Sequence, residues 1–534
     1  MGEDLLKDKT FGRRKPVDAA TGTICVRRTG LRCSSRTLLL LALTGGCLFA
    51  SSCISTTIAV APSGAAKESS GPAESSLQIT DPATNEEIEG YASAASLNRG
   101  EDIKLYVNTK EPSYAIEVLR VGWYGGRGMK RMTSAIVRRG VAQAPPELDF
   151  ASGLIECDWK DPYILHVPNT PDPEDWPSGI YLAKLTAGSS GKQGYIVFVV
   201  RDDQRSSDLL FQSSVTTYQA YNDWGGRSLY SKPRATKVSF NRPYAKVHGT
   251  GLLLLWELSL VRFLEKEGYD VTYTTDVDTH ERGNLLSLHK AFLSTGHDEY
   301  WSWQMRDNVE AARDNGVNLA FFGANVGYWQ IRFEPSPITG APDRTIVCYK
   351  NQSSDPMSHS DDPSVRRLTT VKFRSHPVDR PEDALVGVMY ESDPVQGDIV
   401  VSDASSWVFE GTGLKNGDRL PGLLGYEVDR SSEHTPLGAQ RIAHSPYAFR
   451  GNTRYADMIV YTAPSGSTVV ATGTMQWSWG LVDPEIPGKQ YENPAVQVAT
   501  RNIFRRFGAR PGSSMIGSMQ GSPRNESDVQ DAKK

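Results

Sequence analysis

The stretch Lys290-Ala-Phe-Leu-Ser-Thr-Gly-His-Asp-Glu-Tyr-Trp301 decides the fold class of this chain. Its first six residues predict a short β-strand around Ala291-Phe-Leu293, and a polar cluster follows where that strand ends. Ser302–Asn315 is amphipathic, ends before Gly316 as helices often do, and leads into a second apolar run, Val317–Phe322. Strand, helix and strand in this order predict a parallel sheet joined by helical crossovers.

The same alternation continues upstream. Asp208–Val215 is a short apolar run, and Tyr269–Thr275 is rich in residues that favour strands. Between them, Leu252–Lys266 has apolar residues at helical spacing and is followed by Gly268, a helix stop. These segments extend the prediction to an α/β domain whose sheet is covered by helices on both faces.

Downstream, the pattern is less regular. The stretch 330–450 is rich in Asp, Pro and Gly, and we interpret it as an inserted or peripheral part that carries β-structure. After it, Asp457–Tyr461 and Val469–Gly473 predict a strand pair, and Asn493–Phe507 predicts a closing helix. We therefore place the α/β domain at 204–511 and expect a disordered polar tail over 512–534.

The preceding region, 78–203, has a different periodicity. Short runs alternate apolar and polar residues and are separated by turn residues, which predicts an antiparallel β-sandwich. The Gly122–Gly126 loop carries two aromatic residues, and we expect it to pack against the next domain or, alternatively, to face a sugar or other substrate. The predicted strands are Ile103–Val107, Ala115–Val121, Gly179–Leu185 and Tyr195–Val200.

The N-terminus has the features of an export signal. Residues 1–36 form a basic leader, and 37–61 contains no charged residue and begins with a strongly apolar run. We predict a signal or anchor segment over 37–61 and a flexible linker over 62–77. Cleavage, retention as a membrane anchor and lipidation at Cys47 or Cys53 all stay open, so the protein is expected to be exported, either secreted or membrane-tethered.

Composition limits the partners. The formal net charge is −4, which gives no general attraction to nucleic acid. Beyond residue 61 the chain has two cysteines, Cys157 and Cys348, for which we favour two separate buried thiols over a disulfide. Cys348 has no histidine nearby in the sequence, and no GxSxG, HExxH, P-loop or GxGxxG motif occurs in the folded part. The sequence leaves oligomerisation open.

Three polar clusters follow predicted strands: Gly296–Trp301, Gly323–Asn325 and Thr216–Tyr230. Because ligand sites of parallel sheets lie beyond the carboxyl ends of the strands, we expect these clusters to meet at one edge. Tyrosinate and carboxylate oxygens are hard anionic donors, which suit Fe(III). A metal held by them would polarise an amide carbonyl or activate water.

A purely structural role is the alternative. Tyr218, Tyr221 and Tyr230 would then pack between the two domains. His297 and Glu299 would brace the helix that starts nearby, since acidic residues favour helix N-termini. Composition and spacing leave both interpretations open.

Four strings resemble a known family. They are Ser294-Thr-Gly-His-Asp-Glu-Tyr-Trp301, Tyr218-Gln-Ala-Tyr-Asn222, Phe322-Gly-Ala-Asn325 and Gly473-Thr-Met-Gln-Trp477. Together they are similar to the C-terminal catalytic domain of the N,N-dimethylformamidase large (beta) subunit, over roughly 205–508. The resemblance implies a glutamine-amidotransferase-like fold that lacks the usual catalytic cysteine.

The resemblance also implies a mononuclear iron site. In such a site two tyrosines and one glutamate hold the metal, and we place them at Tyr221, Tyr230 and Glu299. His297 and Asn325 match a histidine and an asparagine of the pocket, where they would position the substrate.

This chain departs from the family pattern in the region of the tyrosines. It is shorter between the two tyrosine positions, so Tyr218 and Tyr244 stay open as alternative ligands. A second carboxylate of the family's pocket has no assigned position here.

Two hypotheses follow. The first is an exported, Fe(III)-dependent hydrolase of a C–N bond in a small amide. The second is a non-catalytic surface or glycan-binding protein in which the α/β domain is a scaffold.

Overall fold

The structure is a computed structural model that describes residues 77–172, 174–484 and 489–512. The predicted leader (1–36) and signal or anchor segment (37–61) lie outside these residues, as does nearly all of the predicted linker and tail. Among the described residues, no helix combines the length and the apolar character that crossing a bilayer requires.

The N-terminal strands form two facing sheets. One contains β1, β3 and β7, and the other contains β2, β9, β8, β4 and β5, with β6 also paired to β4. Alternate residues of β3 are buried, and they meet side chains of β4, β8 and β9 in one apolar core. The four predicted strands are confirmed, and one pair, β2 with β9, is parallel. The bounds are β1 Glu89–Ala92, β2 Ser96–Asn98, β3 Asp102–Asn108, β4 Ser113–Val121, β5 Met129–Arg131, β6 Ile136–Arg139, β7 Tyr163–His166, β8 Gly179–Ala187 and β9 Gln193–Arg201.

The Gly122–Gly126 loop packs against a helix of the following region, which confirms that alternative. Lys266 Nζ lies 5.0 Å from the centre of the Trp123 ring. Arg120 donates to the Tyr124 hydroxyl at 2.7 Å and forms an ion pair with Glu265 at 2.7 Å. The aromatic residues of this loop therefore help to join the sandwich to the rest of the molecule.

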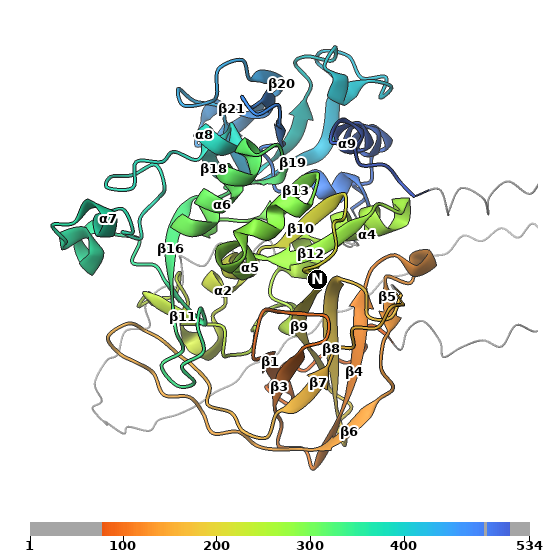
Figure 1. The fold of residues 1–534 in the computed structure, drawn as a ribbon, viewed down its shortest axis with the longest axis vertical. Helices are drawn as coiled ribbons and strands as arrows, with labels where there is room; N and C mark the ends of the chain where they lie inside the picture. The colour runs from red at the N-terminus through yellow and green to blue at the C-terminus, as the bar shows by residue number, and fades with distance from the viewer. Residues whose placement is uncertain (1–76, 173, 485–488, 513–534) are drawn as a thin grey trace, which may run out of the picture. The chain divides into compact units, whose positions relative to one another are not determined.

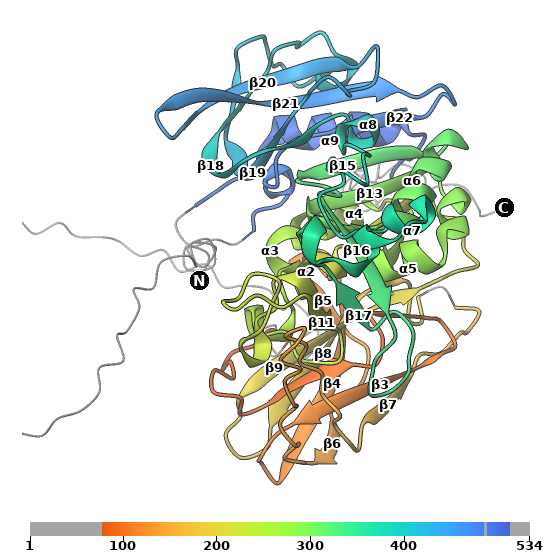
Figure 2. The same cartoon turned by 90° about the vertical axis from the view of Figure 1, so that its left-hand side faces the viewer.

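The second region is built on a sheet of seven strands, with helices packed beside it (Figure 1, Figure 2). Its first five strands are parallel, four of them as predicted, but β21 and β20 are antiparallel, so the sheet is mixed rather than wholly parallel; the predicted strand pair is β21 with β22. The strand order is β12 (Val271–Thr275), β10 (Leu209–Ser213), β13 (Ala291–His297), β15 (Asn318–Ala324), β22 (Thr468–Ala471), β21 (Asn452–Thr462) and β20 (Gln440–Phe449).

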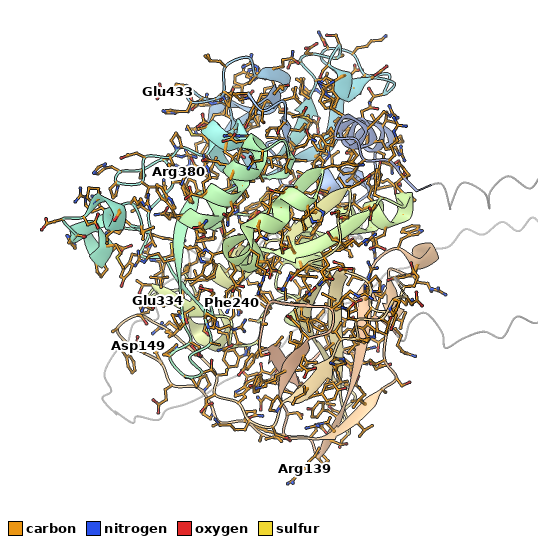
Figure 3. All side chains as sticks on the ribbon, viewed as in Figure 1. Arg139, Asp149, Phe240, Glu334, Arg380 and Glu433 are labelled. Atoms are coloured by element: carbon orange, nitrogen blue, oxygen red, sulfur yellow. The ribbon has the colours of Figure 1, made fainter. Side chains whose placement is uncertain are left out.

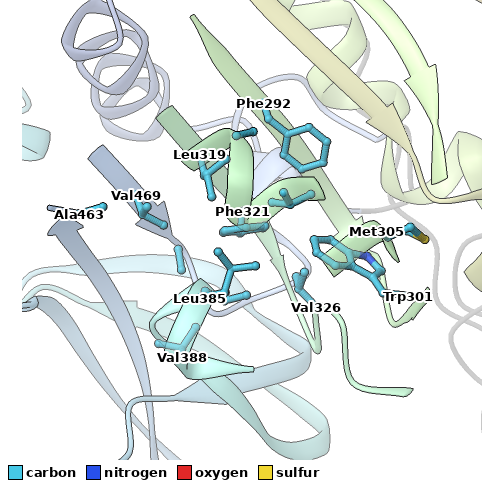
Figure 4. Close-up of a cluster of buried hydrophobic side chains, with 14 of the residues drawn as sticks. Phe292, Trp301, Met305, Leu319, Phe321, Val326, Leu385, Val388, Ala463 and Val469 are labelled. Atoms are coloured by element: carbon cyan, nitrogen blue, oxygen red, sulfur yellow. The ribbon is translucent and has the colours of Figure 1, made fainter. Parts of the chain in front are cut away.

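Helices cover both faces of this sheet. Phe321 and Phe322 are neighbours in β15 and are both fully buried, so their side chains point to opposite faces. Phe321 packs in a core with Met305 of α6 (Trp303–Asp314) and Leu385 of α8 (Asp383–Val386), as Figure 4 shows. Phe322 lies 5.8 Å from Phe504 of α9 (Pro494–Arg506). The predicted α6 and α9 are thereby confirmed.

The stretch 330–450 is more than a peripheral insertion. It supplies β20, an edge strand of the main sheet, and it supplies β19, which reaches the candidate site. The interpretation of this stretch as peripheral was wrong because strands far along the chain complete the sheet. The remaining strands are β11 (Lys237–Ser239), β14 (Tyr300–Ser302), β16 (Trp329–Glu334), β17 (Thr345–Val347), β18 (Met389–Val400) and β19 (Arg419–Arg430), and the short helices include α2 (Val215–Ala220), α5 (Asp276–Glu281) and α7 (Pro363–Arg366).

Buried polar contacts join the sandwich to the second region. Arg201 of β9 pairs with Asp278 of α5 at 2.8 Å, and both side chains are almost fully buried. Arg344 donates to the Ala92 carbonyl at 2.9 Å and lies over the ring of Phe240, which Figure 3 labels. Cys157 and Cys348 are free and buried, which confirms the two-thiol prediction.

The predicted helix over Leu252–Lys266 is interrupted at Glu257. It forms α3 (Leu253–Trp256) and α4 (Leu258–Glu267), and α4 ends at Gly268 as expected. The buried Glu257 carboxylate accepts hydrogen bonds from the Ser213 hydroxyl and the Ser214 N–H, both at 2.8 Å, and from the Tyr218 hydroxyl. Burial raises the pKa of Glu257 to about 7.

Replacing Glu257 with glutamine should change how stability depends on pH. Because the pKa of Glu257 is raised on folding, its protonation stabilises the folded state. This contribution is fully present below about pH 4.5 and is lost as the pH rises to about 7. Between these limits the wild-type free energy of unfolding should fall relative to that of Glu257→Gln, by about 1.4 kcal/mol per pKa unit. Urea denaturation across this range measures the difference. The exposed Glu433→Gln is the control, and a pH-independent difference for Glu257→Gln would contradict the prediction.

Candidate active site

Glu299 lies just beyond β13, in the short connection to β14. Its backbone N–H donates to the Thr217 hydroxyl of α2 at 2.9 Å, which ties this connection to the end of the first strand. The preceding Asp298 faces the interior, where it accepts from Ser294 at 2.7 Å and from the Trp301 indole N–H at 2.7 Å. Asp298 therefore stabilises the turn, whereas the Glu299 side chain points toward Tyr221, Tyr230 and His297.

Two tyrosine hydroxyls converge on the Glu299 carboxylate. Tyr221, at the end of α2, donates to Oε2 at 2.8 Å, and Tyr230 donates to Oε1 at 3.0 Å. The two rings stack with centroids 4.2 Å apart, and the Tyr300 hydroxyl donates to that of Tyr230 at 2.5 Å. Burial, and then the negative charge of Glu299, raise the pKa of both tyrosines well above the ordinary value. Both phenols are therefore neutral donors here, although Tyr230 as a whole residue is 41% exposed.

His297 lies between two carboxylates. Its Nε2 is 3.3 Å from Glu299 Oε2 and 3.2 Å from Glu427 Oε2, and all three side chains are buried. Glu427 comes from β19, and sequence reasoning did not find it. The available signal was the pair Glu427 and Asp429, two acidic residues on one side of an otherwise apolar strand run.

Asn325 orients Glu427. Its side-chain amide donates to Glu427 Oε2 at 2.7 Å, and its backbone N–H donates to Asp429 Oδ1 at 2.8 Å. The backbone of Asn325 has φ 58°, a left-handed conformation that asparagine tolerates better than most residues. Its buried Oδ1 has no hydrogen-bond partner among the described residues. This acceptor is therefore available to a bound molecule.

The alternative tyrosines lie elsewhere. The Tyr218 hydroxyl donates to Glu257, and Tyr244 lines a small cavity of about 30 Å³ between the sandwich and the second region. The helix-bracing alternative also finds no support, because Ser302 caps α6 through the Met305 N–H at 3.0 Å.

The donor set can be compared with the expected metal. In the part of the chain that the structure describes, no group of three or more His, Cys, Asp and Glu side chains is arranged to hold a metal ion. The expected ligand set is of a different kind, because two of its three members, Tyr221 and Tyr230, are tyrosines. Both tyrosine hydroxyls are already within hydrogen-bonding distance of the Glu299 carboxylate. Such hard oxygen donors fit a trivalent iron.

The fold and the site together define a class. It is a β-sandwich followed by a mixed α/β sheet, with two tyrosines and a carboxylate at the carboxyl ends of the parallel strands. The model of the family "N,N-dimethylformamidase beta subunit-like, C-terminal" matches residues 115–493, and the chain belongs to this family. The match begins within the sandwich, further upstream than the sequence motifs indicate.

A curated relative carries the same name. The chain is 22% identical over 308 residues to the N,N-dimethylformamidase beta subunit of Alcaligenes sp. The alignment covers 51% of this chain and 40% of that protein, so the chain spans well under half of its relative's length.

The left-handed backbone at residue 325 gives a stability prediction. Asn325→Gly and Asn325→Val both remove the hydrogen bond to Glu427, but only valine is strained at φ 58°. Asn325→Val should therefore be less stable than Asn325→Gly by about 1–3 kcal/mol. Chemical denaturation at pH 7 measures this, and equal stabilities would show that the site does not impose this backbone conformation.

Proposed function

We propose that this protein is an iron-dependent hydrolase of a C–N amide bond. The observation that carries the proposal is the convergence of the Tyr221 and Tyr230 hydroxyls on Glu299, beside the His297–Glu427 pair. Membership of the family supports the same reaction class. Tyr221, Tyr230 and Glu299 would hold the iron, which when bound supplies a Lewis acid for a carbonyl oxygen or for water.

The chain's own residues have distinct roles in this proposal. His297 and Glu427 lie within 3.2 Å of each other and can hold or pass a proton during attack and departure of the amine. Asn325 holds Glu427 in place and presents Oδ1 to a substrate N–H or to water. Burial raises the pKa of both the Cys157 and the Cys348 thiols, which disfavours the reactive thiolate form.

Three finer points belong to the proposal. The α/β region is a glutamine-amidotransferase-like domain that lacks that fold's catalytic cysteine. The substrate is a small amide. The protein acts outside the cytoplasm, after export through the segment 37–61.

The first test measures metal content and activity. Iron-loaded protein should contain about one iron per chain and show a tyrosinate-to-iron band in its visible spectrum. Tyr221→Phe should weaken that band, and Glu299→Ala should lose the metal. Glu427→Gln should keep the iron but lower kcat by about 10²- to 10⁴-fold, the usual contribution of a general acid or base.

A second outcome would favour the non-catalytic alternative. If the purified protein takes up no iron, and Glu299→Ala changes neither its metal content nor its activity, the α/β region is a scaffold. Exposed Lys415→Met is the matched control, and it should alter neither iron content nor rate.

A further inference from the structure

Lys350 lies over the exposed side of the site. Its Nζ is 3.5 Å from the centre of the Tyr230 ring, 4.9 Å from that of Trp329 and 5.1 Å from that of Tyr300. Each of these separations is within the range of a cation–π contact. The ammonium group is therefore placed directly above one of the two tyrosines that contact Glu299.

The backbone holds Lys350 in this place. Its φ is 58°, which is unusual for a lysine and is kept only where the surrounding structure enforces it. The Lys350 N–H donates to the Thr370 carbonyl at 2.9 Å, and the Tyr349 N–H donates to the Thr370 hydroxyl at 2.8 Å. Strain of this kind concentrates at functional sites.

A second lysine extends the same surface. Lys372 Nζ lies 4.9 Å from the centre of the Tyr328 ring and 5.9 Å from that of the Trp329 ring. The centre of the Trp329 ring is therefore within 5.9 Å of the ammonium groups of both Lys350 and Lys372. Arg374 also lies over Tyr328, at 5.2 Å, but it is paired with Glu382 at 2.9 Å. We call this surface the lysine–aromatic surface; it consists of Lys350, Lys372 and the rings of Tyr230, Tyr300, Tyr328 and Trp329.

The two lysines differ from Lys192 and Lys237 in their contacts with acidic side chains. Among the described residues neither ammonium group forms an ion pair or a hydrogen bond, whereas Lys192 pairs with Asp81 at 2.6 Å and Lys237 with Glu334 at 2.5 Å. The acids that attract Lys350 electrostatically are in the site itself, and tyrosine hydroxyls and Asn325 already donate to them. Lys350 therefore places a positive charge beside the site without forming an ion pair among the described residues, and Lys372 lies on the far side of the contact with Trp329, near the Tyr328 ring.

We propose that the substrate of this site is an amide that carries an anionic group, such as a carboxylate, next to the amide nitrogen. This inference rests on the proposed function. Lys350 binds the anion by charge-assisted hydrogen bonds, Lys372 adds a second positive charge, and Trp329 packs against the carbon chain. Water adds to the carbonyl carbon, the C–N bond breaks, and the nitrogen leaves as an amine that takes up a proton.

A matched pair of amides tests the proposal with the iron-loaded full chain. N-formylglycine carries the carboxylate, and N-methylformamide is its neutral counterpart. The wild-type kcat/KM for N-formylglycine should exceed that for N-methylformamide by about 10- to 100-fold, the effect expected of a hydrogen bond to a charged group. Lys350→Met should remove most of this preference through KM, and Lys372→Met should reduce it less. Lys415→Met should leave it intact.

The outcomes separate the two proposals. Equal kcat/KM for both amides, or a preference that Lys350→Met and Lys372→Met leave unchanged, overturns the inference but leaves amide hydrolysis in place.

If neither amide is hydrolysed, the proposed function fails, and calorimetric titration with N-acetylglycine and N-methylacetamide then tests anion recognition alone. Binding of N-acetylglycine only, lost in Lys350→Met, supports the lysine–aromatic surface. Absence of binding, or equal binding of both, overturns it. If Lys350→Met does not fold, Lys372→Met decides.

Discussion

The in-register parallel pairing of β13 and β15 positions the candidate site. Gly296 lies opposite Gly323, and His297 lies opposite Ala324. A Cβ atom on Gly323 would come within 2.7 Å of the Gly296 carbonyl oxygen, so these two strands can approach only without a side chain there. Both strands then end at the same level, and the loops after them bring the Glu299 and Asn325 regions together at one edge.

The site concentrates acidic groups where water is scarce. Glu299, Glu427 and Asp429 are nearly fully buried, and burial raises the pKa of Asp429 to about 7. Donors from separate elements stabilise them: the tyrosine hydroxyls at Glu299, and Asn325 at both other carboxylates. Buried polar networks of this kind are stable only when the partners stay in place, which is why sheet, loops and β19 act as one unit.

Local sequence patterns predicted the regular elements well. The alternating strands of the sandwich, β13, β15, α6 and α9 all follow from apolar periodicity and stop residues. The patterns failed where a distant side chain decided the outcome. Leu252–Lys266 has a helical pattern throughout, yet the helix is interrupted at Glu257, whose carboxylate bonds to Ser213 and Ser214 of another segment. Likewise, no local pattern marks β20 as an edge strand of the main sheet.

The sequence by itself determined the two periodicities, the strand–helix order and the motif residues His297, Glu299 and Asn325, because these depend on neighbouring residues along the chain. The choice of Tyr221 and Tyr230 over Tyr218 rested on the resemblance, and only the tertiary structure places their hydroxyls on Glu299. Glu427 and Lys350 were found in the structure alone. They reach the site from segments about 128 and 51 residues beyond Glu299, by sequence number, and contacts at such separations depend on how the whole sheet assembles.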